Sequence, residues 1–345
     1  MKRRTFMAGT LGLGALGLGL NLNLNLNSSL STAPGRPAGL PARMQLYSGA
    51  DLAFGTTISI QVLHFDQHQA ELAITEAIAA ATKIDRLMTL HRADSQVVLL
   101  NRNGFIDRPD PHLLAVLTRA RELSMLTQGA FDVTVQPLWQ TYSDAGTRGV
   151  LPVDAQRRAA TALVDWQQLS FDEQRVALLR PGMAITLNGI AQGYAVDVAR
   201  AALTARGIRH ALLDTGEFSA SGTKDGVQDW QVGIRAPRDP QALAAVLAMH
   251  GRCVATSGDY ETFFTPDFAH HHIFDPASGD SPGELASATV MAPTGLQADG
   301  LSTALMVLGA DKGLALAATL AGVDALLIGK DGRRWRSAGL PVLPV

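Results

Sequence analysis

The chain has 345 residues, of which 47% are apolar, so it can bury a large core. Its 29 basic and 31 acidic residues give a net charge of −2 with no block of like charge, which argues against binding to nucleic acid or to an anionic membrane surface. Cys253 is the single cysteine, which excludes an internal disulfide and a zinc site built from cysteines.

The first 43 residues have the composition of an export signal and a tether. The basic run MKRR precedes an apolar Gly/Leu stretch that is short for a membrane span. Paired arginines followed by Thr5 and Phe6 are typical of a twin-arginine signal, and an ordinary secretory signal or an uncleaved membrane anchor are the alternatives. The low-complexity stretch up to Arg43 is rich in Asn, Ser and Pro. We therefore expect residues 1–43 to direct export to the periplasm and residues 44–345 to form the folded domain.

The folded part opens with a strand and two helices. Residues 56–63 alternate branched and polar side chains, which predicts a strand with one buried face. Residues 69–90 carry apolar side chains three and four apart, which predicts a long amphipathic helix. A second helix is predicted over residues 111–126, with Asp110 as its cap. A polar loop is expected at residues 143–149.

The later elements are shorter. Residues 184–187 predict a strand that leads through a glycine turn into a helix closing at Gly207. Five short β-rich segments bounded by Gly, Pro or Asp are predicted as strands, namely residues 210–214, 230–235, 253–257, 288–293 and 324–329. Residues 299–322 predict two helices with a turn at residues 309–311. The expected fold is a mixed α/β unit, with residues 140–180 as a candidate subdomain.

Common nucleotide-binding and zinc-protease motifs are absent. The glycine-containing segments have neither Walker spacing nor a G-x-G-x-x-G pattern after a strand. The sequence also lacks H-E-x-x-H, which argues against zinc proteolysis. One G-x-S-x-G match occurs, at residues 279–283, but it does not join a predicted strand to a predicted helix, as the nucleophile turn of an α/β-hydrolase does.

Five other segments combine glycines with polar side chains. They are GAFDVT (129–134), NGIAQGYAVD (188–197), TSGDY (256–260), HHHIFDPASG (270–279) and ADGLSTALMVLG (298–309). Each one alone has an ordinary structural explanation, such as a helix end, a strand–turn–helix connection, surface histidines or a helix cap. Asp132 and Thr134 share one face if the first segment is extended. The glycines around Gln192 leave backbone amides free for a phosphate or carbonyls free for a metal.

Two of these segments point to chemistry by residue type. Asp299 and Thr303 lie one turn apart on a predicted helix, and such an oxygen-only pair favours Mg²⁺, which commonly accompanies phosphates. Within the histidine run only His270 and His272 share a face of an extended segment, and no further nitrogen or sulfur ligands lie at zinc spacing. One histidine with an acid–base or phosphate-binding role fits this pattern better than a zinc site.

Taken together and in this order, the five segments resemble the ApbE family of FAD:protein FMN transferases, from about residue 54 to about residue 329. The resemblance implies an α/β flavin transferase fold of two lobes with FAD between them. It implies Mg²⁺-dependent transfer of FMN from FAD to a Thr or Ser hydroxyl of an extracytoplasmic electron-transfer protein, with release of AMP. The acceptor is expected to be a membrane-bound or periplasmic flavoprotein. The export signal and the DTGE segment (214–217) favour the NosX-type subgroup associated with nitrous-oxide respiration.

The resemblance also assigns the site residues. The Mg²⁺ ligands would be the backbone carbonyl of Gly189 and the side chains of Asp299 and Thr303. The catalytic residues would be Asp299 and His272, with His272 as the proton acceptor. Contacts with FAD are expected at Phe54, His91, Ala130, Phe131, Asp132, Thr186, Gln192, His272, Ile273 and Phe274.

Several of these positions depart from the family pattern. Phe54 stands in place of a methionine, His91 in place of a tyrosine, and the DTGE segment replaces a Gly-Gly pair. Thr186 stands where Asp is common and Gln192 where Lys or Glu is common. Loss of the charge at position 192 predicts weaker FAD binding or an altered hold on the leaving group, whereas Phe54 and His91 still offer flat or apolar surface to a flavin. Two alternatives follow: an FAD carrier without transferase activity, and an Mg²⁺-dependent FAD pyrophosphatase.

Overall fold

The computed structural model describes residues 44–344, so the predicted leader and tether lie outside the described residues. The largest element is an eight-stranded sheet in which all neighbours are antiparallel. In spatial order its strands are β1 (Gln45–Ala53), β2 (Thr56–His64), β6 (Ala211–Asp214), β7 (Phe218–Ser221), β10 (Cys253–Gly258), β11 (Leu285–Ala292), β12 (Asp324–Gly329) and β13 (Arg334–Arg336).

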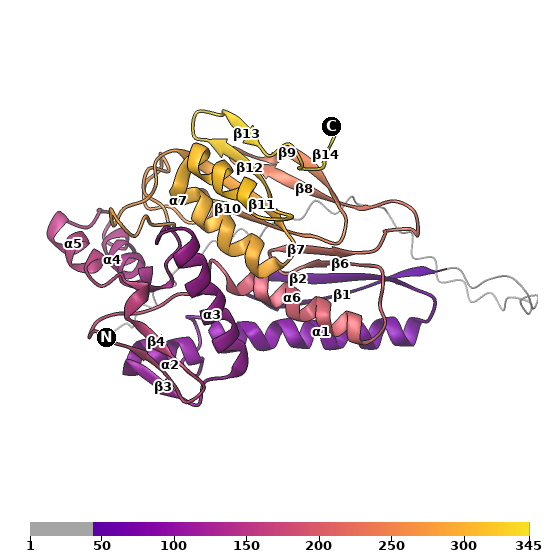
Figure 1. The fold of residues 1–345 in the computed structure, drawn as a ribbon, viewed down its shortest axis with the longest axis horizontal. Helices are drawn as coiled ribbons and strands as arrows, with labels where there is room; N and C mark the ends of the chain where they lie inside the picture. Colours follow the sequence, from indigo (N-terminus) through magenta and orange to yellow (C-terminus); the bar gives the residue numbers. More distant parts are fainter. Residues whose placement is uncertain (1–43, 345) are drawn as a thin grey trace, which may run out of the picture.

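Three helices lie side by side over one face of this sheet (Figure 1): α1 (Gln67–Met88), α6 (Ala191–Ala205) and α7 (Gly295–Thr319). The buried side of α1 is largely alanine, which lets α6 approach closely, and β2 adds branched side chains to the same core. The opposite face of the sheet is covered by a second, three-stranded sheet of β14 (Val342–Leu343), β9 (Asp239–Met249) and β8 (Trp230–Ala236). The middle strands β7, β10, β11 and β12 are therefore buried on both sides, whereas the edge strand β1 is mostly exposed.

The rest of the chain forms a group of short elements at one end of the molecule (Figure 1). It contains α2 (Gln96–Asn103), α3 (Pro111–Leu126), α4 (Gln136–Gly146), α5 (Asp154–Thr161) and a small sheet of β3 (Phe105–Asp107), β5 (Arg175–Leu178) and β4 (Leu169–Phe171). Two 3₁₀ turns, Val133–Val135 and Trp166–Gln168, connect these elements. Leu169 and Val176, which lie in the candidate subdomain, join the main hydrophobic core.

Most of the predicted elements are confirmed. The predicted helix over residues 111–126 is α3, with Asp110 accepting a hydrogen bond from the backbone of His112 and proline in the first turn. The turn predicted within residues 299–322 is a break in α7 at Gly309, where φ is 77°. The helix α6 ends at Ala205, just before Gly207 with φ 76°. β2, β6, β8, β10, β11 and β12 lie where strands were predicted.

Two predictions are wrong, and one condition is not met. Residues 184–187 form no strand, because the side chain of Asn101 bonds both the N–H and the carbonyl of Ile185 in place of a neighbouring strand. The GAFDVT segment, in which Asp132 and Thr134 would share a face if it were extended, turns at Asp132, which caps a 3₁₀ turn. The loop expected at residues 143–149 is helical as far as Gly146.

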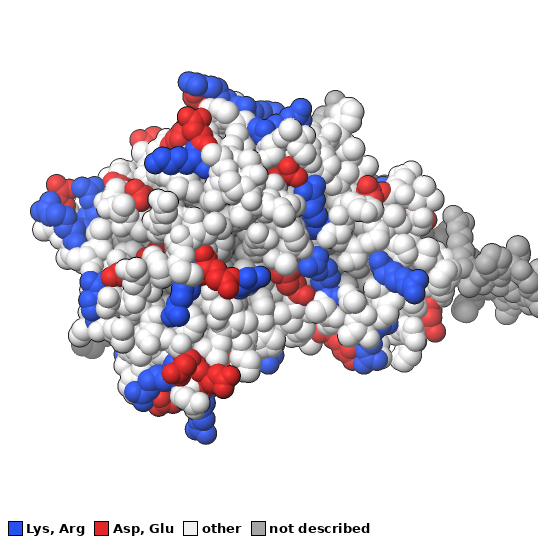
Figure 2. All heavy atoms as spheres, viewed as in Figure 1, with Lys and Arg blue, Asp and Glu red and all other residues white. Residues whose placement is uncertain are grey.

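Charges of both signs are interspersed on the face seen in Figure 2, and large areas of that face carry no charged side chain. This agrees with the balanced composition of the sequence.

Candidate functional site

A cleft of about 1000 Å³ lies where the large sheet and its helices meet the group of short elements. Every residue that the sequence assigned to FAD or to a metal lines it: Phe54, His91, Ala130, Phe131, Asp132, Thr186, Gly189, Gln192, His272, Ile273, Phe274, Asp299 and Thr303. These residues come from segments spread over almost the whole described chain. The fold brings them together, and their individual roles stay predictions.

The β1–β2 hairpin forms one rim of the cleft. Its two-residue turn, Phe54–Gly55, has both residues in the left-handed region, with φ of 54° and 73°. That geometry suits hairpin twist but is costly for a bulky residue such as Phe54. The strained turn holds the half-buried Phe54 at the cleft, beside His91 from the segment after α1. The departure from methionine thus places an aromatic ring at this rim.

The carboxylate of Asp132 organises the opposite wall. Its Oδ1 accepts hydrogen bonds from the backbone N–H and the hydroxyl of Thr134, at 2.7 and 2.6 Å, and its Oδ2 accepts from the N–H of Trp166 at 3.1 Å. Burial raises its pKa, and these bonds oppose that shift. Both carboxylate oxygens therefore hold the local backbone in place. The adjoining residues Ala130 and Phe131 line the cleft.

The floor of the cleft is the crossing of α6 and α7. A Cβ at Gly193 would lie 2.2 Å from the carbonyl oxygen of Gly295, so only glycine permits this approach. A Cβ at Gly189 would lie 2.8 Å from Thr303 Oγ1, so the Gly189 backbone rests against that hydroxyl. Gly189 and Gly193, whose backbone was predicted to contact a metal or a phosphate, thus also allow α6 and the residues before it to pack closely against α7.

Gln192 is tied to the loop before β7. Its Nε2 donates to the carbonyl of Thr215 at 3.1 Å, and Thr215 Oγ1 donates to the carbonyl of Gln192, also at 3.1 Å. Gln192 and the DTGE segment therefore contact each other directly. The neutral Gln192 side chain holds the DTGE segment against the start of α6.

Asp299 is 4% exposed, and its Oδ2 accepts a hydrogen bond from the N–H of Gly193 at 2.9 Å. Burial raises its pKa to about 7, with a further upward contribution from the charge of Asp197. Thr303, one turn later, has its hydroxyl 3.2 Å from Ser257 Oγ. The predicted pair of a carboxylate and a hydroxyl thus exists at the base of the cleft.

The donor atoms near Asp299 suit Mg²⁺. Between residues 44 and 344, no three His, Cys, Asp or Glu side chains are grouped closely enough to hold a metal by themselves. A metal here would also need the carbonyl of Gly189 and the hydroxyl of Thr303, an all-oxygen set of the kind that Mg²⁺ prefers. Asp299 Oδ1 makes no hydrogen bond within the described residues, so a coordinating oxygen is available. The residues present fit the ion.

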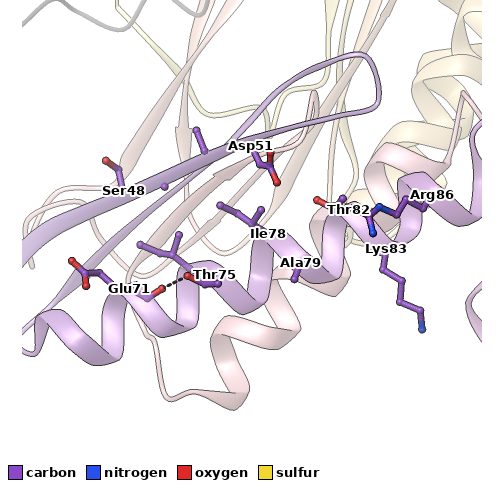
Figure 3. A pocket seen from close by; sticks show the side chains of 12 residues that line it. Ser48, Asp51, Glu71, Thr75, Ile78, Ala79, Thr82, Lys83 and Arg86 are labelled. Atoms are coloured by element: carbon purple, nitrogen blue, oxygen red, sulfur yellow. Dashed lines mark hydrogen bonds between the residues drawn. The ribbon is translucent and has the colours of Figure 1, made fainter.

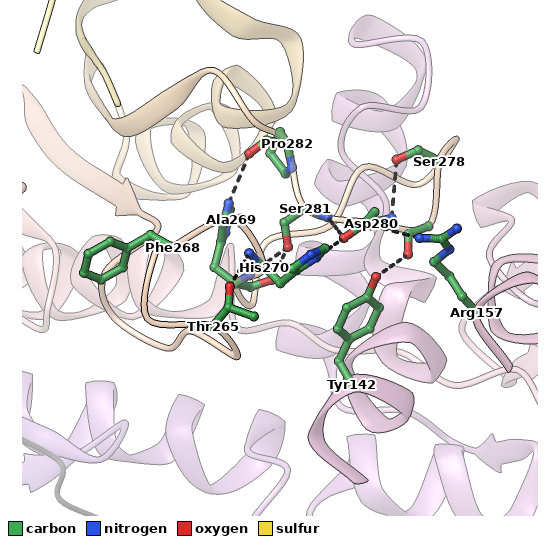
Figure 4. Close-up of polar contacts among 12 residues, drawn as sticks. Tyr142, Arg157, Thr265, Phe268, Ala269, His270, Ser278, Asp280, Ser281 and Pro282 are labelled. Carbon is green, nitrogen blue, oxygen red and sulfur yellow. Dashed lines mark hydrogen bonds and ion pairs between the residues drawn. The ribbon is translucent and has the colours of Figure 1, made fainter. Parts of the chain in front are cut away.

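The three histidines have separate environments. His271 is fully buried, which lowers its pKa to about 3, and its Nε2 lies 3.2 Å from the carbonyl of Pro282. His270 does not line the cleft; its Nδ1 lies 2.7 Å from Asp280, which also pairs with Arg157 (Figure 4). These contacts anchor the loop. Of the three, His272 alone reaches the cleft.

His272 is set up to accept a proton. Its Nδ1 lies 3.0 Å from the backbone carbonyl of Thr262, and because a carbonyl can only accept, Nδ1 carries the hydrogen. Nε2 then has a free lone pair. Burial lowers the pKa of His272, which keeps the ring neutral near pH 7. This tautomer matches the predicted role as a base.

Sequence reasoning missed charged residues in the cleft. Glu217 is 8% exposed, lines the cleft, and has its pKa raised well above the usual range by burial and then by the charge of Asp299. Its one sequence signal was the unusual DTGE segment. Arg235 is the last residue of a predicted strand and pairs with Glu261, and Arg238, three residues later, pairs with the fully buried Asp259. No spacing pattern in the sequence connects these partners.

A second hollow, of about 610 Å³, runs between β1 and α1 (Figure 3). Ser48 and Asp51 of β1 and Thr75, Thr82 and Lys83 of α1 are among the residues that line it. It contains none of the predicted site residues. The chemistry predicted from the sequence therefore belongs to the larger cleft.

Comparisons with known proteins agree with this geometry. The model of the ApbE family matches residues 54–327. A Klebsiella pneumoniae protein named FAD:protein FMN transferase is 30% identical over 297 residues, covering 83% of this chain and 90% of that protein. A Treponema pallidum protein of the same name is 31% identical over 325 residues, covering 87% of this chain and 89% of that protein.

A solved structure has the same fold. The flavin transferase ApbE from Vibrio cholerae superposes with a TM-score of 0.74 at 26% identity, covering 86% of this chain and 98% of that chain. The expected flavin transferase fold is confirmed by this match. The chain belongs to the ApbE family.

Proposed function

We propose that this chain is an Mg²⁺-dependent FAD:protein FMN transferase, which attaches FMN to a Thr or Ser hydroxyl of a partner protein and releases AMP. The relatives that it matches over most of their length carry that name. The observation that carries the proposal is the meeting of an oxygen-only donor set, Gly189, Asp299 and Thr303, with the neutral His272 in one cleft.

The cleft has the size and lining that a flavin dinucleotide needs. Its volume of about 1000 Å³ is at the upper end of the usual range for ligand sites. Phe54, Phe131, Tyr260 and Phe274 supply apolar and aromatic walls for the flat rings. The polar base around Asp299 supports binding of the pyrophosphate at that place.

Asp299, Thr303 and the carbonyl of Gly189 would hold the Mg²⁺ ion. When bound, the ion supplies neutralisation of the negative charge on the pyrophosphate. Gly193 orients Asp299 through its N–H, and Ser257 contacts the hydroxyl of Thr303, so the donors are positioned before any ligand arrives.

The reaction is a substitution at the FMN-side phosphorus. The hydroxyl oxygen of the acceptor forms a bond to that phosphorus, and the bond from phosphorus to the oxygen of AMP breaks. His272 Nε2 takes the hydroxyl proton, while its Nδ1–H stays bonded to the carbonyl of Thr262. The products are protein-linked FMN and AMP.

Export of this enzyme to the periplasm by the twin-arginine route is part of the proposal, and it is supported by the basic and apolar pattern of residues 1–43. The acceptor would then be a membrane-bound or periplasmic flavoprotein, such as one serving nitrous-oxide or other respiratory electron transfer. Fractionation of cells that express the full chain tests the location.

The biochemical test is incubation of the purified chain with FAD, Mg²⁺ and a candidate acceptor domain, followed by mass spectrometry of that domain. The proposal predicts covalent FMN on a Thr or Ser, abolished by EDTA and by Asp299→Ala. Free FMN with AMP and an unmodified domain would identify a pyrophosphatase instead. Bound, intact FAD with several acceptor domains would identify a carrier.

A further inference from the structure

We propose that Glu217 is a second carboxylate ligand of the cation held by Asp299 and Thr303. Glu217 directly precedes β7, whereas the other two residues lie on α7. The inference rests on the proposed Mg²⁺ dependence and adds a residue from a different element to that site.

Glu217 is largely buried and has one weak hydrogen-bond partner in the protein. It is 8% exposed, and its Oε2 accepts one long hydrogen bond, from the N–H of Thr256 at 3.3 Å. Its Oε1 makes no hydrogen bond to any residue between 44 and 344. Burial of an ionised carboxylate is costly unless a cation or several hydrogen bonds compensate it. Glu217 lines the cleft, so a cation can reach it there.

Two chains of contacts bring Glu217 to the Asp299–Thr303 pair. On one side, Thr256 bonds Glu217 while the next residue, Ser257, contacts the hydroxyl of Thr303. The backbone from Thr256 to Ser257 therefore links Glu217 to Thr303.

On the other side, the carbonyl of Thr215 accepts from Gln192, and the adjacent Gly193 donates to Asp299. A Cβ at Gly216 would lie 2.2 Å from Gln192 Nε2, so this loop is pressed against the start of α6. The loop that carries Glu217 is therefore held beside the residues that position Asp299.

The protein's own cations are engaged elsewhere. In the described part of the chain, Arg235 pairs with Glu261, and Arg238 and Lys330 pair with Asp259. No Lys, Arg or His forms an ion pair with Glu217 or Asp299 within these residues. Two largely buried carboxylates that line one cleft without a protein cation fit Mg²⁺, which proteins commonly bind through one or two carboxylates together with substrate phosphates.

The test is a titration of the purified full chain with Mn²⁺ in the absence of FAD, with free Mn²⁺ followed by electron paramagnetic resonance. The variants are Glu217→Gln, Asp299→Asn and the matched control Glu261→Gln. Glu261 also lines the cleft, but it is paired with Arg235, so its substitution removes one negative charge from the cleft without removing a ligand.

We expect Glu217→Gln to weaken Mn²⁺ binding by at least about tenfold, Asp299→Asn to weaken it at least as much, and Glu261→Gln to change it by less than about threefold. Glu217→Asp, which keeps the charge on a shorter side chain, should restore part of the affinity. Melting temperatures in EDTA check that each variant is folded. Mg²⁺ should raise the melting temperature of the unsubstituted chain more than that of Glu217→Gln.

Unchanged Mn²⁺ affinity in Glu217→Gln, together with a large loss in Asp299→Asn, would overturn the role of Glu217 and leave the proposed Mg²⁺ site standing. Equal weakening by Glu217→Gln and Glu261→Gln would overturn it too, because the effect would then be one of overall charge. Absence of Mn²⁺ binding to the unsubstituted chain, with and without FAD, would overturn both the site and this inference.

Discussion

The backbone N–H of Gly193 donates to Asp299 Oδ2 at 2.9 Å, and this bond joins the first turn of α6 to α7 at the base of the cleft. The carboxylate is thereby held by backbone rather than by a flexible side chain. Since the two helices touch only because both carry glycine at the crossing, helix packing and the position of the proposed ligand are coupled.

Gly193→Ala should disturb both the packing of α6 against α7 and the position of Asp299. The added Cβ would lie 2.2 Å from the carbonyl oxygen of Gly295 and 2.6 Å from Asp299 Cβ, so the helices must separate. We expect the free energy of unfolding to fall by about 1–3 kcal/mol, as for overpacked cores, and divalent cation affinity to fall with it. Urea denaturation measures the first effect. Gly283→Ala is the control because nothing lies within 4 Å of its added Cβ, and an equal loss there would contradict the account.

The stability of the metal-free protein should depend on pH through Asp299. Its pKa is about 7 in the folded state against 3.8 ordinarily, so between about pH 4 and pH 7 the folded state keeps a proton that the unfolded state has lost. The free energy of unfolding therefore falls as pH rises through this range, by up to about 1.4 kcal/mol per pH unit from this group.

Denaturation in EDTA at pH 5 and at pH 8 measures this effect. Asp299→Asn should remove the part of the fall that Asp299 causes, while Glu217, whose pKa is also raised by burial, still contributes. The variant should therefore be the more stable protein at pH 8 without metal. Mg²⁺ should stabilise the unsubstituted chain at pH 8 but not the variant. The same difference in stability between the two proteins at both pH values would contradict this explanation.

His272→Ala should lower the rate of FMN transfer by about 10²- to 10⁴-fold while FAD still binds, since a positioned base contributes roughly that factor. Because burial lowers the pKa of His272, the rate of the unsubstituted enzyme should stay level to a pH below the ordinary histidine value of 6.5. The control is His270→Gln, which changes the same histidine run outside the cleft. Stopped assays of AMP release give both rates, and equal losses in the two variants would exclude a role specific to His272.

Arg238 should stabilise the loop that carries His272. Asp259 is fully buried, Arg238 contacts both of its oxygens at 2.7 Å, and the Arg238 guanidinium lies 4.2 Å from the ring of Phe268. Arg238→Met leaves Lys330 at 3.7 Å as the remaining ion-pair partner, so we expect a loss of about 1–3 kcal/mol in the free energy of unfolding.

The double variant Arg238→Met/Asp259→Leu should recover part of that loss, because it removes the fully buried carboxylate, while Lys330 keeps its hydrogen bond to the carbonyl of Phe268. Urea denaturation of both variants measures the difference. A double variant less stable than the single one would show that the ion pair is not the cause.

Helices and strands whose conformation depends on neighbouring residues were predicted correctly from local sequence patterns. The Asp110 cap and the apolar spacing of α3 are contained in consecutive residues, and so is the alternation of β2. Residues 184–187 have a strand-like alternation too, but their backbone is bonded by Asn101, and no local pattern reveals a partner 84 positions away. The edge strand β1 was missed because it is mostly exposed and so lacks the alternation of a half-buried strand.

The residues of the cleft were predicted from the order of the five motifs along the chain rather than from the physical properties of single positions. Asp299 and Thr303 were recognisable as a pair because one helical turn separates them. Glu217 was not assigned, since only the tertiary fold places the start of β7 beside β10, which packs against α7. The ion pairs of Arg235 and Arg238 join strand ends to a distant loop and leave no periodic signal in the sequence.

The most direct test of the account compares the amounts of three products in one reaction of the purified chain with FAD, Mg²⁺ and an acceptor domain: AMP, free FMN and FMN attached to the domain. The account predicts one attached FMN for each AMP released, with almost no free FMN, and no AMP when the acceptor hydroxyl is replaced by Ala. AMP and free FMN in equal amounts, whether or not the acceptor is present, would contradict it.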